Sequence, residues 1–185
     1  ALWTHFAMLT SKMNFLRYAK MPSDAGNKQL TLQIPQFQAS ISASRDTSTA
    51  DFLVYTDGSK TSSGVGSGVA IFNKKMIPVA NKSFPLGELA TVFQAEAFAV
   101  FKATEILENI KNAIRGKTVQ IWLDNQSVIH ALNQDLVNSN LIKQLRVKLN
   151  SLATFCQLSI NWCRGHTGVM LSLIHISEPT RLRRI

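Results

Sequence analysis

Three acidic residues in this sequence have the chemical type and the setting of metal ligands. Asp57 follows the apolar run FLVYT, and Asp124 follows the apolar run VQIWL. Each is the first acid at the carboxyl end of a predicted strand, and ligand sites in open α/β sheets lie just outside such ends. An aspartate after a strand is also typical of an ordinary turn. The two aspartates alone therefore do not establish a site.

Glu96 strengthens the case, because it lies in the middle of the apolar stripe of a predicted helix over residues 89–110. An ionised carboxylate on a buried face is unfavourable unless it is paired or binds a metal. Lys102, the nearest cation on the helix, projects elsewhere, so the alternatives are a neutral Glu96 with a raised pKa and a bound cation. A cation shared with Asp57 and Asp124 accounts for all three acids. Oxygen ligands without Cys or His beside them are typical of Mg²⁺ or Mn²⁺.

The elements that must position these acids lie within residues 51–170. The first predicted strand ends at a turn signal, Asp57-Gly58-Ser59. Three clustered strands, then helix, strand, helices and strand, predict an α/β fold with a mixed sheet. The predicted strands are FLVYT at 52–56, VGSGVAIF at 65–72, MIPVANKSF at 76–84, TVQIWLDN at 118–125 and CQLSINWC at 156–163, and the predicted helices are 89–110, 127–133 and 140–155.

Residues 1–50 have a different composition. Residues 22–50 are rich in Ser, Thr, Gln and Ala, which is typical of a linker, with a short extended stretch at Leu30–Ile34. Residues 11–20 are interpreted as a short basic helix left over from an upstream region. We therefore divide the chain into a linker and upstream remnant at 1–50 and one folded domain at 51–170.

The charge and the cysteine content of the chain limit the kinds of partner and the cellular compartment that it suits. The 185 residues carry a net charge of +9, which favours a polyanionic partner, although a solvated cationic surface is the alternative. Cys156 and Cys163 lie seven apart on a predicted strand and so point to opposite faces. Unpaired cysteines indicate an intracellular location. The sequence has no apolar run long enough to span a membrane.

Four motifs in this order resemble a type 1 ribonuclease H domain: YTDGS at 55–59, QAE at 94–96, LDNQ at 123–126 and CRGHTG at 163–168. The resemblance covers about residues 51–170 and is closest to LINE-type (non-LTR) retrotransposon polyproteins. It implies a five-stranded mixed sheet, its first three strands antiparallel, flanked by helices. It also implies hydrolysis of the RNA strand of RNA–DNA hybrids by two metal ions, beside a reverse transcriptase in the same polyprotein and as a monomeric domain.

The resemblance also implies roles for individual residues. Asp57, Glu96 and Asp124 correspond to three of the family's four carboxylate ligands, and His166 to a loop histidine that assists turnover. The residues expected to contact the hybrid are Gly58, Ser59, Asn125 and Ser127. Cellular members often have polar residues three and four positions before the helix glutamate, where this chain has Phe93 and Val92. The contacts of this chain with the hybrid are therefore expected to differ from those of the cellular members.

The end of the chain departs from the family's pattern. The fourth carboxylate is expected near position 176, where this chain has Ile176. The run LSLIHISEPTR at 171–181 resembles a translated sequencing adapter, so residues 171–185 are interpreted as foreign and the final helix as missing. The chain as written is then expected to be a poor enzyme. The alternative function is a catalytically impaired nucleic-acid-binding module on the same fold.

Overall fold

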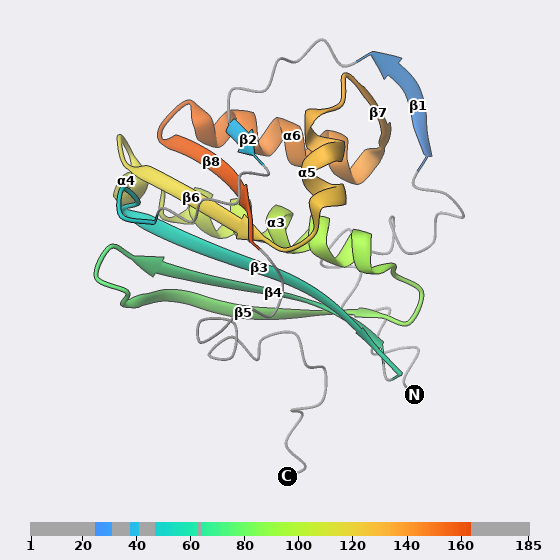
Figure 1. Ribbon diagram of the computed structural model, residues 1–185, viewed down its shortest axis with the longest axis horizontal. Coiled ribbons are helices and arrows are strands. Elements are labelled where there is room, and N and C mark those ends of the chain that lie inside the picture. Colours follow the sequence, from blue (N-terminus) through green and yellow to red (C-terminus); the bar gives the residue numbers. More distant parts are fainter. Residues whose placement is uncertain (1–24, 31–37, 41–46, 63, 164–185) are drawn as a thin grey trace.

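A computed structural model of the chain describes residues 25–30, 38–40, 47–62 and 64–163 (Figure 1). The predictions made for residues 11–20, for His166 and for the segment 171–185 lie outside these residues, and so does the extended stretch predicted at Leu30–Ile34, except for Leu30. Within the described part of the chain, no helix is long and apolar enough to cross a membrane.

The centre of the fold is a mixed sheet with the strand order β2-β8-β6-β3-β4-β5. The five predicted strands form it as expected: β3 pairs antiparallel with β4 and β4 with β5, while β3, β6 and β8 run parallel. A three-residue strand, β2, extends the sheet beyond β8. The bounds are β2 Gln38–Ser40, β3 Phe52–Thr61, β4 Gly64–Asn73, β5 Pro78–Gly87, β6 Thr118–Leu123 and β8 Gln157–Trp162.

The predicted turn at Asp57-Gly58-Ser59 is wrong, because β3 continues through these residues to Thr61. Asp57 lies opposite Gly68 of β4, and the antiparallel pairing runs on to the last residue of β3. A turn signal is only a local preference. Here all ten residues of β3 pair with residues of the long antiparallel strand β4, and the hydrogen bonds of this ladder outweigh the preference.

Helix α3 (Val92–Asn109) begins three residues later than predicted. Thr91 caps it: the Thr91 hydroxyl accepts from the Gln94 backbone N–H, and the Gln94 side chain accepts from the Thr91 N–H. Such a capping box satisfies two backbone donors that would otherwise lack partners. Leu89, predicted in the apolar stripe, precedes the helix and is 77% exposed.

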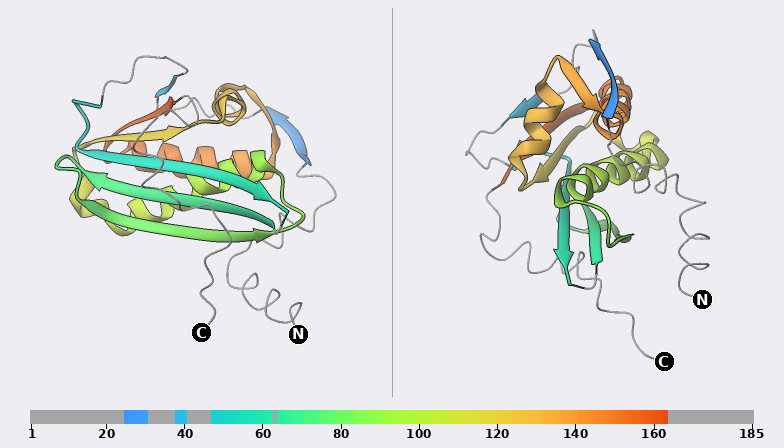
Figure 2. Two further views of the ribbon diagram at one scale, coloured as in Figure 1. Left: turned by 60° about the horizontal axis from the view of Figure 1, so that its bottom comes forward. Right: turned by 90° about the vertical axis from the view of Figure 1, so that its right-hand side faces the viewer.

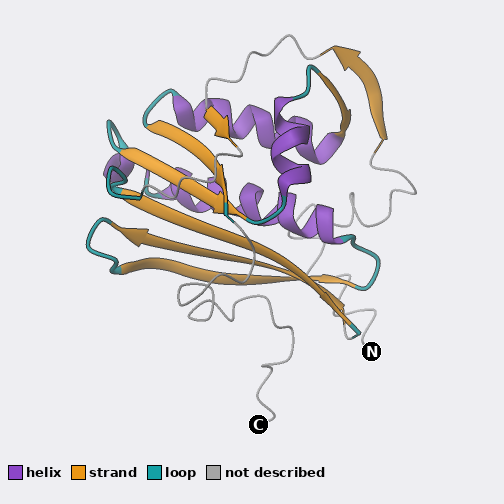
Figure 3. Ribbon diagram, viewed as in Figure 1, coloured by secondary structure: helices purple, strands orange, loops and turns teal. Residues whose placement is uncertain are grey.

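Helices α3 and α6 (Asn140–Ala153) cover one face of the sheet, as the two views of Figure 2 show. The shorter helices are α4 (Lys111–Ile114) and α5 (Gln126–Asn133), and α5 follows directly after β6 (Figure 3). Apolar side chains of α3, α5 and α6 pack against the sheet to form the main core. A second, smaller cluster on the opposite face includes Leu53, Tyr55 and Trp122.

The two cysteines confirm the prediction that they point to opposite faces. Cys156 packs in the main core and Cys163 in the second cluster, and no disulfide joins them.

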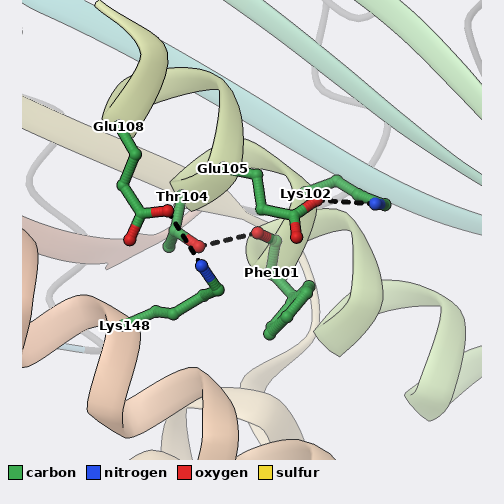
Figure 4. Close-up of polar contacts among 6 residues, drawn as sticks. All are labelled: Phe101, Lys102, Thr104, Glu105, Glu108 and Lys148. Carbon is green, nitrogen blue, oxygen red and sulfur yellow. Dashed lines mark hydrogen bonds and ion pairs between the residues drawn. The ribbon is translucent and has the colours of Figure 1, made fainter. Parts of the chain in front are cut away.

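Charged side chains of α3 contact each other and α6 (Figure 4). Lys102 Nζ lies 2.6 Å from Glu105 Oε2, and Lys148 Nζ of α6 lies 2.8 Å from Glu108 Oε2. The expectation that Lys102 projects away from Glu96 is therefore confirmed.

The segment predicted as a linker contributes two short strands. β1 (Ala25–Leu30) pairs antiparallel with β7 (Leu136–Ser139), which lies between α5 and α6. β2 pairs parallel with β8 at the edge of the main sheet. β1 and β7 form a separate two-stranded sheet, and the backbone pairing of such short strands requires no particular side-chain pattern. This is why the composition of residues 22–50 did not predict them.

Candidate active site

The structure brings Asp57, Glu96 and Asp124 together, as the sequence predicted. Each residue offers one carboxylate oxygen, and these three atoms lie within 4.8 Å of one another. Glu96 is 2% exposed, and the two aspartates are partly buried. Asp57 comes from β3, Glu96 from the second turn of α3, and Asp124 directly follows the last residue of β6.

The two central strands part where the three acids meet. The parallel pairing of β3 with β6 ends at Tyr55 and Trp122. Neighbouring residues of a strand point to opposite faces, so Asp57 shares the face of Tyr55, whereas α3 packs on the face of Val54. The Glu96 carboxylate and Asp57 meet beyond Tyr55, where β6 no longer pairs with β3.

Gly58 allows helix α3 to approach β3 this closely. A Cβ atom at Gly58 would lie 2.6 Å from the backbone nitrogen of Glu96 and 2.9 Å from the carbonyl carbon of Ala95. Real Cβ atoms essentially never make contacts so short, so any side chain here would push the helix away. The Gly58 backbone N–H also donates to the Glu96 carboxylate. The predicted contact of Gly58 with a hybrid stays a prediction beside this observed role.

The environment of Glu96 strongly disfavours an isolated negative charge. Burial, followed by repulsion from Asp124 and Asp57, raises the pKa of Glu96 from 4.5 to about 10. The neutral carboxyl shares a hydrogen bond with Asp124, yet its Oε2 atom is buried without a hydrogen-bond partner. A buried polar atom without a partner is unfavourable. Both alternatives considered from the sequence are therefore consistent with this structure. Without a cation the Glu96 carboxyl is neutral, and a bound cation would give its Oε2 atom a partner.

The donor set fits a hard divalent cation. Three carboxylates within reach of one another supply the oxygen ligands that Mg²⁺ and Mn²⁺ take in proteins. A cation between them would cancel the repulsion that raises the pKa of Glu96 and would give Oε2 a partner. The three residues thus form a candidate site for a divalent metal.

Two hydrogen bonds organise the chain around Asp124. The indole N–H of Trp162 in β8 donates to the Asp124 carbonyl at 2.9 Å. The Asn125 side chain caps α5 by accepting from the Ser127 backbone N–H at 2.9 Å. Asn125 and Ser127 lie at the start of a helix beside the acids, and Ser127 is exposed. Their predicted contacts with phosphate or sugar stay predictions.

Ser59 lies further along β3 and is partly buried, and its predicted contact with the hybrid likewise stays a prediction. Two residues that hydrogen-bond to the backbone at or beside the acids were not predicted from the sequence. Ser67 of β4 and Trp162 of β8 each donate to a backbone carbonyl at or beside an acid. The only signal for Ser67 was a small polar residue between glycines inside an apolar strand.

A mixed sheet of this order with three converging carboxylates defines a class of metal-binding α/β proteins. Residues 49–172 match the family model of RNase H, and the chain belongs to that family. Ribonuclease H activity and dependence on a divalent metal are properties of the family. Among curated proteins, none matches the sequence of this chain.

Solved structures share the fold at low sequence identity. LC11-RNase H1, isolated from compost by a metagenomic approach and solved in complex with an RNA/DNA hybrid, is 20% identical with a TM-score of 0.51. That match covers 62% of this chain and 86% of the other. The N-terminal RNase H domain of a Mycobacterium tuberculosis protein, solved as a fusion with maltose binding protein, is 12% identical with a TM-score of 0.51. It covers 68% of this chain and 95% of the other.

Proposed function

We propose that this chain hydrolyses the RNA strand of RNA–DNA hybrids with divalent cations held by Asp57, Glu96 and Asp124. The observation that carries the proposal is the convergence of these three carboxylates within 4.8 Å. Membership in the RNase H family supports the reaction, and a structural neighbour in complex with an RNA/DNA hybrid supports the substrate. The net charge of +9 suits a polyanionic partner.

The cations proposed for this site are two Mg²⁺ or Mn²⁺ ions. When bound, two such ions supply a nucleophilic water and stabilise the leaving 3′ oxygen. Glu96 releases its proton as a cation binds, because metal ligands must be deprotonated. Gly58 keeps the Glu96 carboxylate oriented through its backbone N–H. His166 is proposed to assist turnover near the scissile phosphate.

Cleavage of defined substrates tests the proposed reaction. The full chain is incubated with Mg²⁺ and a hybrid whose RNA strand is end-labelled, and in parallel with single-stranded RNA, double-stranded RNA and double-stranded DNA. Cleavage confined to the hybrid is expected, and it should stop when EDTA is added. Equal cleavage of double-stranded DNA, or no cleavage of any substrate, contradicts the proposal.

Asp57→Asn separates catalysis from binding. The change keeps the shape of the side chain and removes one anionic ligand, so cleavage should be lost while hybrid binding, measured by fluorescence anisotropy, is retained. Surviving cleavage would contradict the assignment of the metal site.

A catalytically impaired binding module is the second candidate, and Ile176 favours it, because the family's fourth carboxylate is expected near that position. This candidate predicts hybrid binding with little hydrolysis at any Mg²⁺ concentration. Substrate turnover of the wild-type chain distinguishes the two candidates. Rapid multiple turnover excludes the impaired module.

We further propose that the domain derives from a LINE-type retrotransposon polyprotein, where it works beside a reverse transcriptase inside the cell. The four motifs and their order support this origin. The genomic sequence beyond the codon for Met170 tests it. A continuation with a Gly-Asn-Glu stretch and an Asp, in a reading frame that also encodes a reverse transcriptase, is expected. A reading frame without a reverse transcriptase contradicts the proposed origin.

A further inference from the structure

Ser67 lies in the sheet directly behind the Glu96 segment of α3. It is a residue of β4 with no exposed surface, and its hydroxyl donates to the Ala95 carbonyl at 2.6 Å. Ala95 directly precedes Glu96, so the hydroxyl contacts the peptide unit from which the Glu96 side chain extends. The bond links two elements that are 28 residues apart in the sequence.

Ser67 and Gly58 contact the same peptide unit from adjacent strands. The two residues are register partners in the β3–β4 pairing, and directly opposed residues share a face of the sheet. Gly58 lies against the Glu96 backbone nitrogen and the Ala95 carbonyl carbon, and Ser67 donates to the oxygen of that same carbonyl. The glycine sets how near the helix can come. The serine hydroxyl then sets where along the sheet the helix rests.

A buried hydroxyl that has no positioning role needs only one hydrogen-bond acceptor, and that acceptor can lie on its own helix or strand. Thr104 illustrates this case: it is fully buried on the same helix and donates to the Phe101 carbonyl at 2.7 Å, entirely within α3. The Ser67 bond differs because it joins the helix to the strand beside the one that carries Asp57. Movement of α3 relative to the sheet would change the separation between Glu96 and Asp57, and the Ser67 bond opposes that movement.

We propose that Ser67 is a positioning residue for the metal-binding carboxylate of Glu96. Its hydroxyl anchors the Ala95–Glu96 peptide so that the three carboxylates stay within reach of one cation. The inference rests on the proposed function, because it takes the acids to be metal ligands. Partners that orient a metal ligand typically change metal affinity or activity by 10–100-fold when they are removed.

Calorimetric titration of the full chain with Mg²⁺ tests the proposal without relying on activity. Ser67→Ala should bind Mg²⁺ on the order of 10-fold more weakly than the wild type. Thr104→Val is the matched control, because it also removes a buried hydroxyl bonded to a carbonyl of α3, and its Mg²⁺ affinity should stay at the wild-type value. Equal affinity of Ser67→Ala and wild type overturns the proposal.

A double-mutant cycle with Glu96→Gln distinguishes positioning from general destabilisation. If Ser67 acts through Glu96, adding Ser67→Ala to Glu96→Gln should leave the remaining Mg²⁺ affinity unchanged, since coupled residues are not additive. An equal loss in both backgrounds overturns the proposal. Where Ser67→Ala does not fold, Ser67→Cys replaces it: a thiol is a weaker donor, so an affinity between those expected for Ala and wild type supports positioning, and wild-type affinity overturns it.

Hybrid cleavage by the same variants separates this inference from the proposed function. Ser67→Ala should lower kcat at limiting Mg²⁺ with the KM for hybrid unchanged, and excess Mg²⁺ should restore kcat. A wild-type chain that binds Mg²⁺ without cleaving the hybrid contradicts the proposed function and leaves the calorimetric test of Ser67 intact. A wild-type chain that binds no Mg²⁺ overturns both.

Discussion

Replacing Glu96 by glutamine should change how the stability of the metal-free protein depends on pH. The folded protein raises the pKa of Glu96 from 4.5 to about 10 by burial and by repulsion from the two aspartates. Between these values the folded state holds a proton that the unfolded state has lost. The contribution of Glu96 to the free energy of unfolding is therefore fully present below about pH 4.5, and it is lost as the pH rises towards about 10.

The magnitude follows from one proton. Each pH unit changes the free energy of unfolding by about 1.4 kcal/mol when the two states differ by one bound proton. Glutamine has no proton to lose, so its contribution stays constant. From pH 6 to pH 8 the stability of Glu96→Gln relative to wild type should therefore rise by roughly 2.7 kcal/mol.

Urea unfolding at pH 6, 7 and 8 in the presence of EDTA measures this difference. Every other titrating group is common to the two proteins and largely cancels from the comparison. Saturating Mg²⁺ is the control: it should reverse the order, because a ligand that binds only the folded state stabilises it and the wild type has the additional carboxylate. A stability difference that stays constant from pH 6 to pH 8 without metal would refute the reasoning, since Glu96 would then be ionised in the folded protein.

Three further substitutions test how the site is built. Gly58→Ala should lower the free energy of unfolding by about 1–3 kcal/mol, as overpacked positions do, because its methyl group would meet the α3 backbone; unchanged urea unfolding would contradict the close approach. Thr91→Ala removes the cap of α3 and should cost about 1 kcal/mol, measured in the same way, with no effect expected if the capping box contributes nothing. Trp162→Phe keeps an aromatic side chain, although a smaller one, and removes the indole N–H that donates to the Asp124 carbonyl. It should weaken Mg²⁺ binding by calorimetry on the order of 10-fold, and wild-type affinity would show that this bond does not position Asp124.

The sequence by itself determined the five strands, the long helix and the three acids. Alternating and continuous apolar runs marked the strands, and the stripe of α3 identified Glu96 as a carboxylate on a buried face. These features are local in sequence, so each could be inferred from a short window of residues. Asp57 lies beside Glu96 and Asp124 as expected, although the turn predicted around it was wrong.

Only the tertiary structure decided how the three acids meet. Asp57 lies on β3 and Glu96 on the helix that covers the sheet, and they approach each other where β3 and β6 have stopped pairing. Gly58 and Ser67 both contact helix α3, which lies far from them in the sequence. Gly58 lies against Glu96, and Ser67 donates to Ala95, which is 28 residues further along the chain. Contacts of this kind depend on the packing of the helix against two neighbouring strands. The residue pattern of one strand does not indicate which helix will pack on it. The supporting roles of Gly58 and Ser67 could therefore not be predicted from the sequence.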